Sequence, residues 1–112
     1  MKIINWKDQE VLKTPHNVDV RKIYDYENAQ VMHIRLQPGE ALKPHITPVN
    51  VFFYILEGIV DVRVGDETYS VSEDYLIESP AGIVHNLSNN SSSVSRIMVV
   101  KSPRPTTSSR IL

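Results

Sequence analysis

Residues 59–72 read Ile-Val-Asp-Val-Arg-Val-Gly-Asp-Glu-Thr-Tyr-Ser-Val-Ser, and this stretch indicates the fold class. In its first half, valines alternate with the charged residues Asp61 and Arg63, which is the period-two pattern of a strand with one buried face. Gly65-Asp66-Glu67 supplies turn residues, and residues 68–72 form a second strand-like run. The stretch therefore predicts a β-hairpin.

Strand patterns also dominate the sequence around this hairpin. Residues 30–36 alternate in the same way, and residues 96–100 form the last predicted strand. Residues 49–56 are apolar on both faces, so this strand needs a core on one side and another sheet or subunit on the other. We therefore expect a homodimer. Helix is predicted only as a turn or two within residues 7–13, and short strands with polar turns favour an all-β sandwich or barrel.

Length and proline placement define the predicted domain organisation. A chain of 112 residues has room for one domain, and a chain of this size can bury about two-thirds of its surface. We expect a single domain over residues 1–112 with a core at about residues 18–101. Pro103 and Pro105 exclude a central strand at the end of the chain. Residues 102–112 are therefore expected to form a loose tail or an arm over a neighbouring chain.

Composition excludes several classes of protein. Twelve basic and thirteen acidic residues give a net charge of -1, which argues against a nucleic-acid partner. The absence of cysteine excludes disulfides, thiolate metal sites and a cysteine nucleophile. No apolar run approaches the roughly 18 residues of a membrane span, and the first residues lack a signal-peptide pattern. We therefore expect a cytoplasmic protein with no membrane partner.

Two segments carry histidines at informative spacings. The first runs over residues 38–47 and closes at Gly58, and the second runs from Pro80 to His85 and is followed by Asn89. From about Ala29 to Val100, the chain resembles the cupin superfamily of small β-barrels. The matching positions are Gly39, His45 and Gly58 in the first cupin motif, and Pro80, Gly82, His85 and Asn89 in the second. The resemblance implies an all-β double-stranded β-helix, or jelly-roll barrel, with a site in its interior.

The chain departs from the cupin pattern at two metal-ligand positions. Thr47 stands where the second histidine of the His-x-His pair is expected, and Val51 stands at the glutamate position. Only His45 and His85 remain of the four ligands that the resemblance implies. Catalytic zinc sites typically use three protein ligands, and iron oxygenase sites use two histidines and a carboxylate. We therefore expect weak or absent affinity for a divalent ion such as zinc, nickel, iron or manganese.

Two further histidines are candidates for a third metal ligand. His33 opposes the apolar side of its strand, so it is predicted to face out of the barrel. His16 lies in a loop next to Pro15, and an N-terminal arm folded over the barrel mouth would bring it to the site. His16 is therefore the preferred candidate.

The predicted pocket is less charged and more apolar than a typical cupin site. Its predicted residues are His45, Thr47, Val51, Phe53 and His85. Further candidates for its wall are Ile55, Val60, Val62, Tyr54 and Tyr69. A small-molecule ligand held by a few polar groups suits such a pocket.

Two functions remain open from the sequence. The first is a cupin that binds a small molecule, with or without a divalent metal and with no catalysis assigned. The alternative is a metal-dependent cupin enzyme that oxidises or isomerises a small metabolite with His45 and His85. Fold resemblance does not choose between them, and no catalytic residue is assigned.

Overall fold

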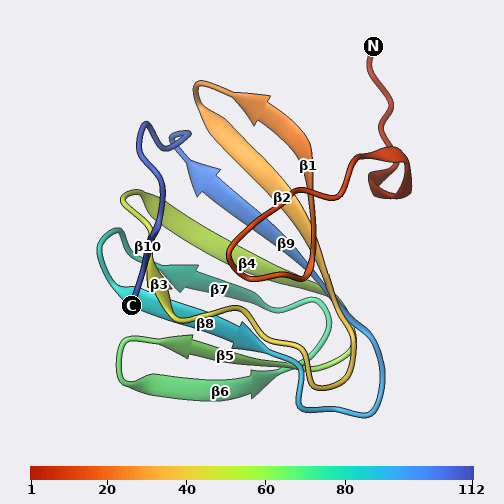
Figure 1. Cartoon of the computed structure of the whole chain (residues 1–112), viewed down its shortest axis with the longest axis vertical. Coiled ribbons are helices and arrows are strands. Elements are labelled where there is room, and N and C mark those ends of the chain that lie inside the picture. The colour runs from red at the N-terminus through yellow and green to blue at the C-terminus, as the bar shows by residue number, and fades with distance from the viewer.

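The computed structural model describes residues 1–112 and contains two five-stranded antiparallel sheets. One sheet has the order β1-β2-β9-β4-β7 and the other has the order β10-β3-β8-β5-β6 (Figure 1). The strands are β1 (Asp19–Tyr26), β2 (Ala29–Leu36), β3 (His45–Ile46), β4 (Asn50–Glu57), β5 (Val60–Val64), β6 (Glu67–Val71), β7 (Leu76–Ser79), β8 (Val84–Ser88), β9 (Ser95–Ser102) and β10 (Arg110–Ile111).

The predicted hairpin is the pair β5 and β6. Val60 pairs with Val71 and Val64 pairs with Glu67. Gly65 lies in the turn between the strands with a φ of 60°, a left-handed conformation that glycine adopts without steric cost. The hairpin closes one edge of the second sheet, and β8 pairs along the other side of β5.

The core lies between the two sheets and contains one apolar cluster. Its twelve buried hydrophobic residues are Val20, Ile34, Leu36, Leu42, Val51, Phe53, Ile55, Val60, Val62, Leu87, Ile97 and Val99. All but Leu42 come from alternate positions of strands in both sheets, as the period-two pattern requires. The prediction of an all-β, two-sheet fold is therefore confirmed.

The N-terminal segment contains one short helical turn, η1 (Trp6–Asp8). The Asn5 side chain accepts a hydrogen bond from the Lys7 backbone N–H and caps this turn. The predicted helical turn is thus confirmed, but it begins earlier and ends sooner than residues 7–13. The chain leaves the helical conformation after the turn, and the Leu12 N–H pairs with the Val20 carbonyl. No helix here has the length and apolar character needed to span a membrane.

The C-terminal segment, residues 103–112, folds back on its own chain. Its strand β10 pairs with β3, with Arg110 opposite Ile46 and Ile111 opposite His45. The blue end of the ribbon runs beside β3 in Figure 1. In this structure the segment is therefore not a loose tail. The Arg104 N–H, between the two prolines, donates to the Glu27 carbonyl, and strand pairing begins at Arg110, so the missing donors of Pro103 and Pro105 do not prevent it.

Candidate functional site

The candidate site is a cavity of about 270 Å³ at one end of the space between the sheets. Half of its eighteen lining residues are hydrophobic. The lining residues are Leu12, Thr14, Pro15, His16, Val20, Met32, Ile34, Leu42, His45, Thr47, Val51, Phe53, His85, Val99, Lys101, Ser108, Ser109 and Ile111.

All five residues predicted for the pocket line this cavity, as does His16. The other wall candidates do not. Ile55, Val60 and Val62 belong to the packed core. Tyr69 is 65% exposed, and the Tyr54 hydroxyl donates to Asp74 at an exposed position. Sequence alternation shows which residues share a face of a strand but does not show which face looks inward.

His45 and His85 meet because β3 and β8 are neighbouring strands with these two residues directly opposite each other. Their Nε2 atoms lie 3.1 Å apart. The Nδ1 atom of His45 is 2.7 Å from the Lys43 carbonyl oxygen. Because a carbonyl oxygen only accepts, His45 carries its proton on Nδ1 and presents a lone pair at Nε2.

His85 is hydrogen bonded at both ring nitrogens. With a proton on its Nε2, His85 donates a hydrogen bond to the lone pair of His45. The same Nε2 atom lies 3.0 Å from Thr47 Oγ1. Its Nδ1 then accepts from the Ser79 hydroxyl at 2.7 Å. Thr47 Oγ1 is in turn 3.1 Å from Ser109 Oγ on the C-terminal segment. As neutral imidazoles, the two rings therefore have a hydrogen-bond partner at every ring nitrogen.

The surroundings of these rings disfavour their charged forms. Burial, followed by the positive charges of His45, Lys101 and His16, lowers the pKa of His85 from 6.5 to about 4. Burial and the Lys101 charge also lower the pKa of His45, against an opposing effect of its bond to the Lys43 carbonyl. Both rings are therefore neutral at pH 7.

His16 reaches the cavity on the N-terminal segment, with its ring centroid 4.7 Å from that of His45. Its Nδ1 accepts a hydrogen bond from the Lys43 N–H at 2.9 Å, so this lone pair is used. Burial and the nearby positive groups lower the pKa of His16 to about 4. The predicted arm over the barrel mouth is thus present, and its histidine is part of the cavity wall.

A divalent metal ion does not fit the donors of this site. Two nitrogens bound side by side to one ion, each at about 2.0–2.1 Å, lie about 3 Å apart, so the separation of His45 and His85 suits a metal. No group of three histidine, cysteine or acidic residues completes the coordination, however. Thr47 and Val51 occupy the remaining ligand positions, and Lys101 places a cation in the same cavity. Two neutral imidazoles beside an ammonium leave the charge of the ion uncompensated.

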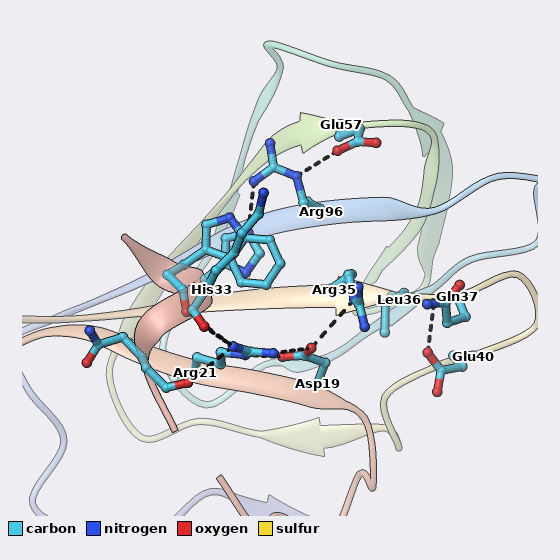
Figure 2. A network of polar contacts seen from close by, with 12 residues as sticks. Asp19, Arg21, His33, Arg35, Leu36, Gln37, Glu40, Glu57 and Arg96 are labelled. Atoms are coloured by element: carbon cyan, nitrogen blue, oxygen red, sulfur yellow. Dashed lines mark hydrogen bonds and ion pairs between the residues drawn. The ribbon is translucent and has the colours of Figure 1, made fainter. Parts of the chain in front are cut away.

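His33 faces away from the cavity, as predicted, and is covered by its own chain. Its ring stacks on Trp6 with centroids 3.9 Å apart. Its Nε2 accepts from Arg96, which also binds Glu57, as Figure 2 shows. Burial and the Arg96 charge lower the pKa of His33 to about 4. This histidine is therefore part of the contact that fixes the N-terminal segment to the outer face of the sheet.

Groups of the site that sequence reasoning missed include Lys101, Ser79, Ser109 and Ile111. Lys101 was missed because the last strand was expected to end at Val100, whereas β9 continues to Ser102. Its parity with Ile97 and Val99 is the signal that places it inward. Ser109 and Ile111 lie on the returning C-terminal segment, whose path has no signal in the sequence pattern.

Comparison with known proteins places this fold and site in a family. The cupin domain family model matches residues 32–101, which is more than half of the chain. The chain therefore belongs to the cupin family.

Individual relatives agree with this assignment. The protein TT1209 from Thermus thermophilus is 31% identical, with a TM-score of 0.80 over 94% of this chain and 100% of that one. An uncharacterised protein from Methanocaldococcus jannaschii is 28% identical over 77% of this chain and 75% of its own length. The polyketide cyclase RemF from Streptomyces resistomycificus has a TM-score of 0.84 over 100% of this chain and 85% of that one. At 20% identity, the similarity to RemF shows the fold alone.

Proposed function

We propose that this cupin binds a small organic molecule in the cavity and does so without a resident metal ion. The observation that carries the proposal is the donor set of the cavity: no third histidine, cysteine or acidic residue joins His45 and His85, and the Lys101 ammonium lines the same cavity. The 3.1 Å contact between the two Nε2 atoms is therefore assigned to a hydrogen bond between the rings.

The shape and lining of the cavity support an organic ligand. Its apolar wall includes Val20, Ile34 and Phe53, whereas hydroxyl and imidazole groups gather near His45 and His85. Binding pockets for small molecules commonly combine an apolar wall with a few polar groups that fix orientation. The volume of about 270 Å³ is near the lower end of the usual range for such pockets.

Metal analysis of the purified protein tests the metal-free part of the proposal. We expect a metal content well below stoichiometric in the wild type, in His45→Ala and in His85→Ala. The opposite result is a stoichiometric metal in the wild type that is lost in both variants. That result would overturn the proposal and favour the metal-dependent enzyme.

Binding of a neutral aromatic probe tests the cavity itself. We expect 2-naphthamide to bind the wild type, with a change in its fluorescence. Val99→Phe fills the cavity and should abolish binding, because Val99 lines it. Val100→Phe is the matched control, since it adds the same side chain at the next position, on the opposite face of β9. Equal binding by the two variants would show that the probe binds elsewhere.

The homodimer remains a prediction based on the outer face of β4. The alternate residues Phe52, Tyr54 and Leu56 on this face are each half-buried within the single chain, so part of the cover they need is already supplied. Sedimentation should give twice the 12.7 kDa chain mass. A monomer at micromolar concentration would contradict this prediction.

A further inference from the structure

Lys101 is a lysine at the polar end of the cavity. It belongs to β9, on which Ile97 and Val99 are buried at alternate positions. Lys101 is the next residue on that inward face and lines the cavity with His45 and His85. Its direct neighbours across the sheet are Val51 of β4 and Gln30 of β2, and neither carries a charge.

Nothing in the protein neutralises this ammonium group. The five ion pairs of the chain involve Arg21, Lys22, Arg35, Arg96 and Arg104, and none involves Lys101. The cavity wall contains no aspartate or glutamate. Burial alone accounts for the lowered pKa of Lys101. Lys101 is half-buried, and a charge partly removed from water without a partner is costly, so this arrangement favours a ligand that supplies the missing negative charge.

The required ligand charge follows from the other groups at this end of the cavity. The imidazoles of His16 and His85 have pKa values of about 4, so they are neutral at pH 7. Lys43 carries the other nearby positive charge, but its side chain is exposed, so water screens it. One half-buried cation surrounded by neutral hydrogen-bonding groups is complementary to one negative charge. The hydroxyls of Thr47 and Ser109 lie in the same wall and are hydrogen bonded to each other, which leaves one of their two protons free to donate to an oxyanion.

We propose that the cavity binds an amphipathic monocarboxylate, whose carboxylate pairs with Lys101 and whose apolar body packs against Ile34, Phe53 and Val99. This inference rests on the proposed function, because it names the chemical class of the ligand in the same cavity. A dianion such as a phosphate monoester is less well matched, because the cavity wall contains one lysine and no arginine. A neutral ligand of the same shape leaves Lys101 unpaired.

A pair of probes that differ in charge tests the inference. The naphthalene ring is common to 2-naphthoate and 2-naphthamide, and only naphthoate carries a negative charge. We expect the wild type to bind naphthoate roughly ten- to a hundred-fold more tightly at pH 7, the range typical of a charge-assisted hydrogen bond. In Lys101→Met this preference should vanish while naphthamide still binds. Lys2→Met is the control, because Lys2 is exposed and does not line the cavity.

The outcomes separate this inference from the proposed function. Equal affinity of the wild type for both probes would overturn the monocarboxylate proposal and leave small-molecule binding intact. Binding of neither probe by the wild type would contradict the proposed function as well. A naphthoate preference that persists in Lys101→Met would also overturn the role of Lys101.

A second measurement avoids substitution at the site. Lysines of the wild type are acetylated with acetic anhydride, and the modified residues are mapped by mass spectrometry. We expect naphthoate to protect Lys101 at concentrations at which naphthamide does not, with Lys2 modified equally in both samples. Equal protection by the two probes would contradict an ion pair between the carboxylate and Lys101.

Discussion

The ring of His85 is fixed by contacts at both nitrogens, with Ser79 on one side and His45 and Thr47 on the other. These contacts suit a neutral ring, and the ring is only 2% exposed. Protonation would place a positive charge beside Lys101 in a buried site. The free energy of unfolding therefore depends on pH through the protonation of His85.

Acidification should destabilise the protein through this histidine. The pKa of His85 falls from 6.5 to about 4 on folding, so between these values the unfolded chain binds a proton that the folded chain does not. The contribution of His85 to the free energy of unfolding is therefore present at pH 7. It is lost as the pH falls from about 6.5 towards 4, by on the order of 2 kcal/mol. Urea unfolding at pH 7 and pH 4.5 measures the loss. His85→Gln should lose less over the same interval, and parallel losses in the two proteins would contradict this prediction.

Lys101 should destabilise the protein in the absence of ligand. Replacing it by methionine keeps an apolar stem and removes the unpaired charge. We expect Lys101→Met to raise the free energy of unfolding at pH 7 by on the order of 1 kcal/mol, measured by urea unfolding. Lys2→Met should have no measurable effect. A clear loss of stability in Lys101→Met would indicate that the ammonium has a partner within the protein.

Gly58 is required by close packing as well as by its backbone conformation. A Cβ at this position would lie 2.6 Å from the Val94 carbonyl oxygen, and φ is 77°. Gly39 has a φ of 87° but nothing within 4 Å of the same atom. We expect Gly39→Ala to cost about 1 kcal/mol and Gly58→Ala about 3 kcal/mol or more. Thermal or urea unfolding compares the two, and equal costs would contradict the role assigned to packing.

Strands with clear alternation could be predicted from the sequence, whereas β1, β7, β8 and the two-residue strands were not predicted. The predicted strands correspond to β2, β4, β5, β6 and β9, each with five or more residues. In contrast, β3 and β10 contain two residues each, which is too short for a period to be seen. The positions of His45 and His85 followed from the motif spacing, and the way in which their rings meet follows from the register of β3 and β8.

The N-terminal segment is held on the outside of the sheet by Arg21 of β1. The guanidinium donates to the carbonyls of Lys7 and Gln9 at 2.8 and 3.2 Å. Its Nε and Nη2 atoms donate to the Asp19 carboxylate (Figure 2). From this attachment the chain continues to Leu12 and His16, which line the cavity. The attachment and the cavity wall are thus parts of one continuous segment.

Loss of Arg21 should therefore release this segment and open the cavity. In Arg21→Met we expect faster cleavage within residues 1–13 by limited proteolysis and weaker binding of 2-naphthamide, because three backbone carbonyls lose their hydrogen bond to the guanidinium. The β-rich circular dichroism spectrum should not change. Arg104→Met is the control, since Arg104 forms an exposed ion pair with Asp25 at 3.4 Å. Equal protease sensitivity of the two variants would contradict this account.

At the scale of the whole molecule, the two sheets enclose a core and a cavity that the terminal segments help to close. Residues 12–16 and 108–111 both contribute to its wall. The sheet architecture could be predicted because alternation and motif spacing are local in sequence. The N-terminal arm with His16 was anticipated only as a candidate, and the C-terminal part of the closure could not be predicted, because it joins Thr47 to Ser109 across more than half of the chain. Long-range contacts of single polar residues have no periodic signal.

The central claim is that His45 and His85 bind each other rather than a metal ion. Nitrogen chemical shifts of the imidazole rings in the purified, isotope-labelled protein test this claim most directly. At pH 7 we predict neutral rings with the proton of His45 on Nδ1 and that of His85 on Nε2, and no change when a chelator is added. If both Nε2 atoms are unprotonated and their shifts move on chelation, the rings hold a metal ion and the claim is wrong.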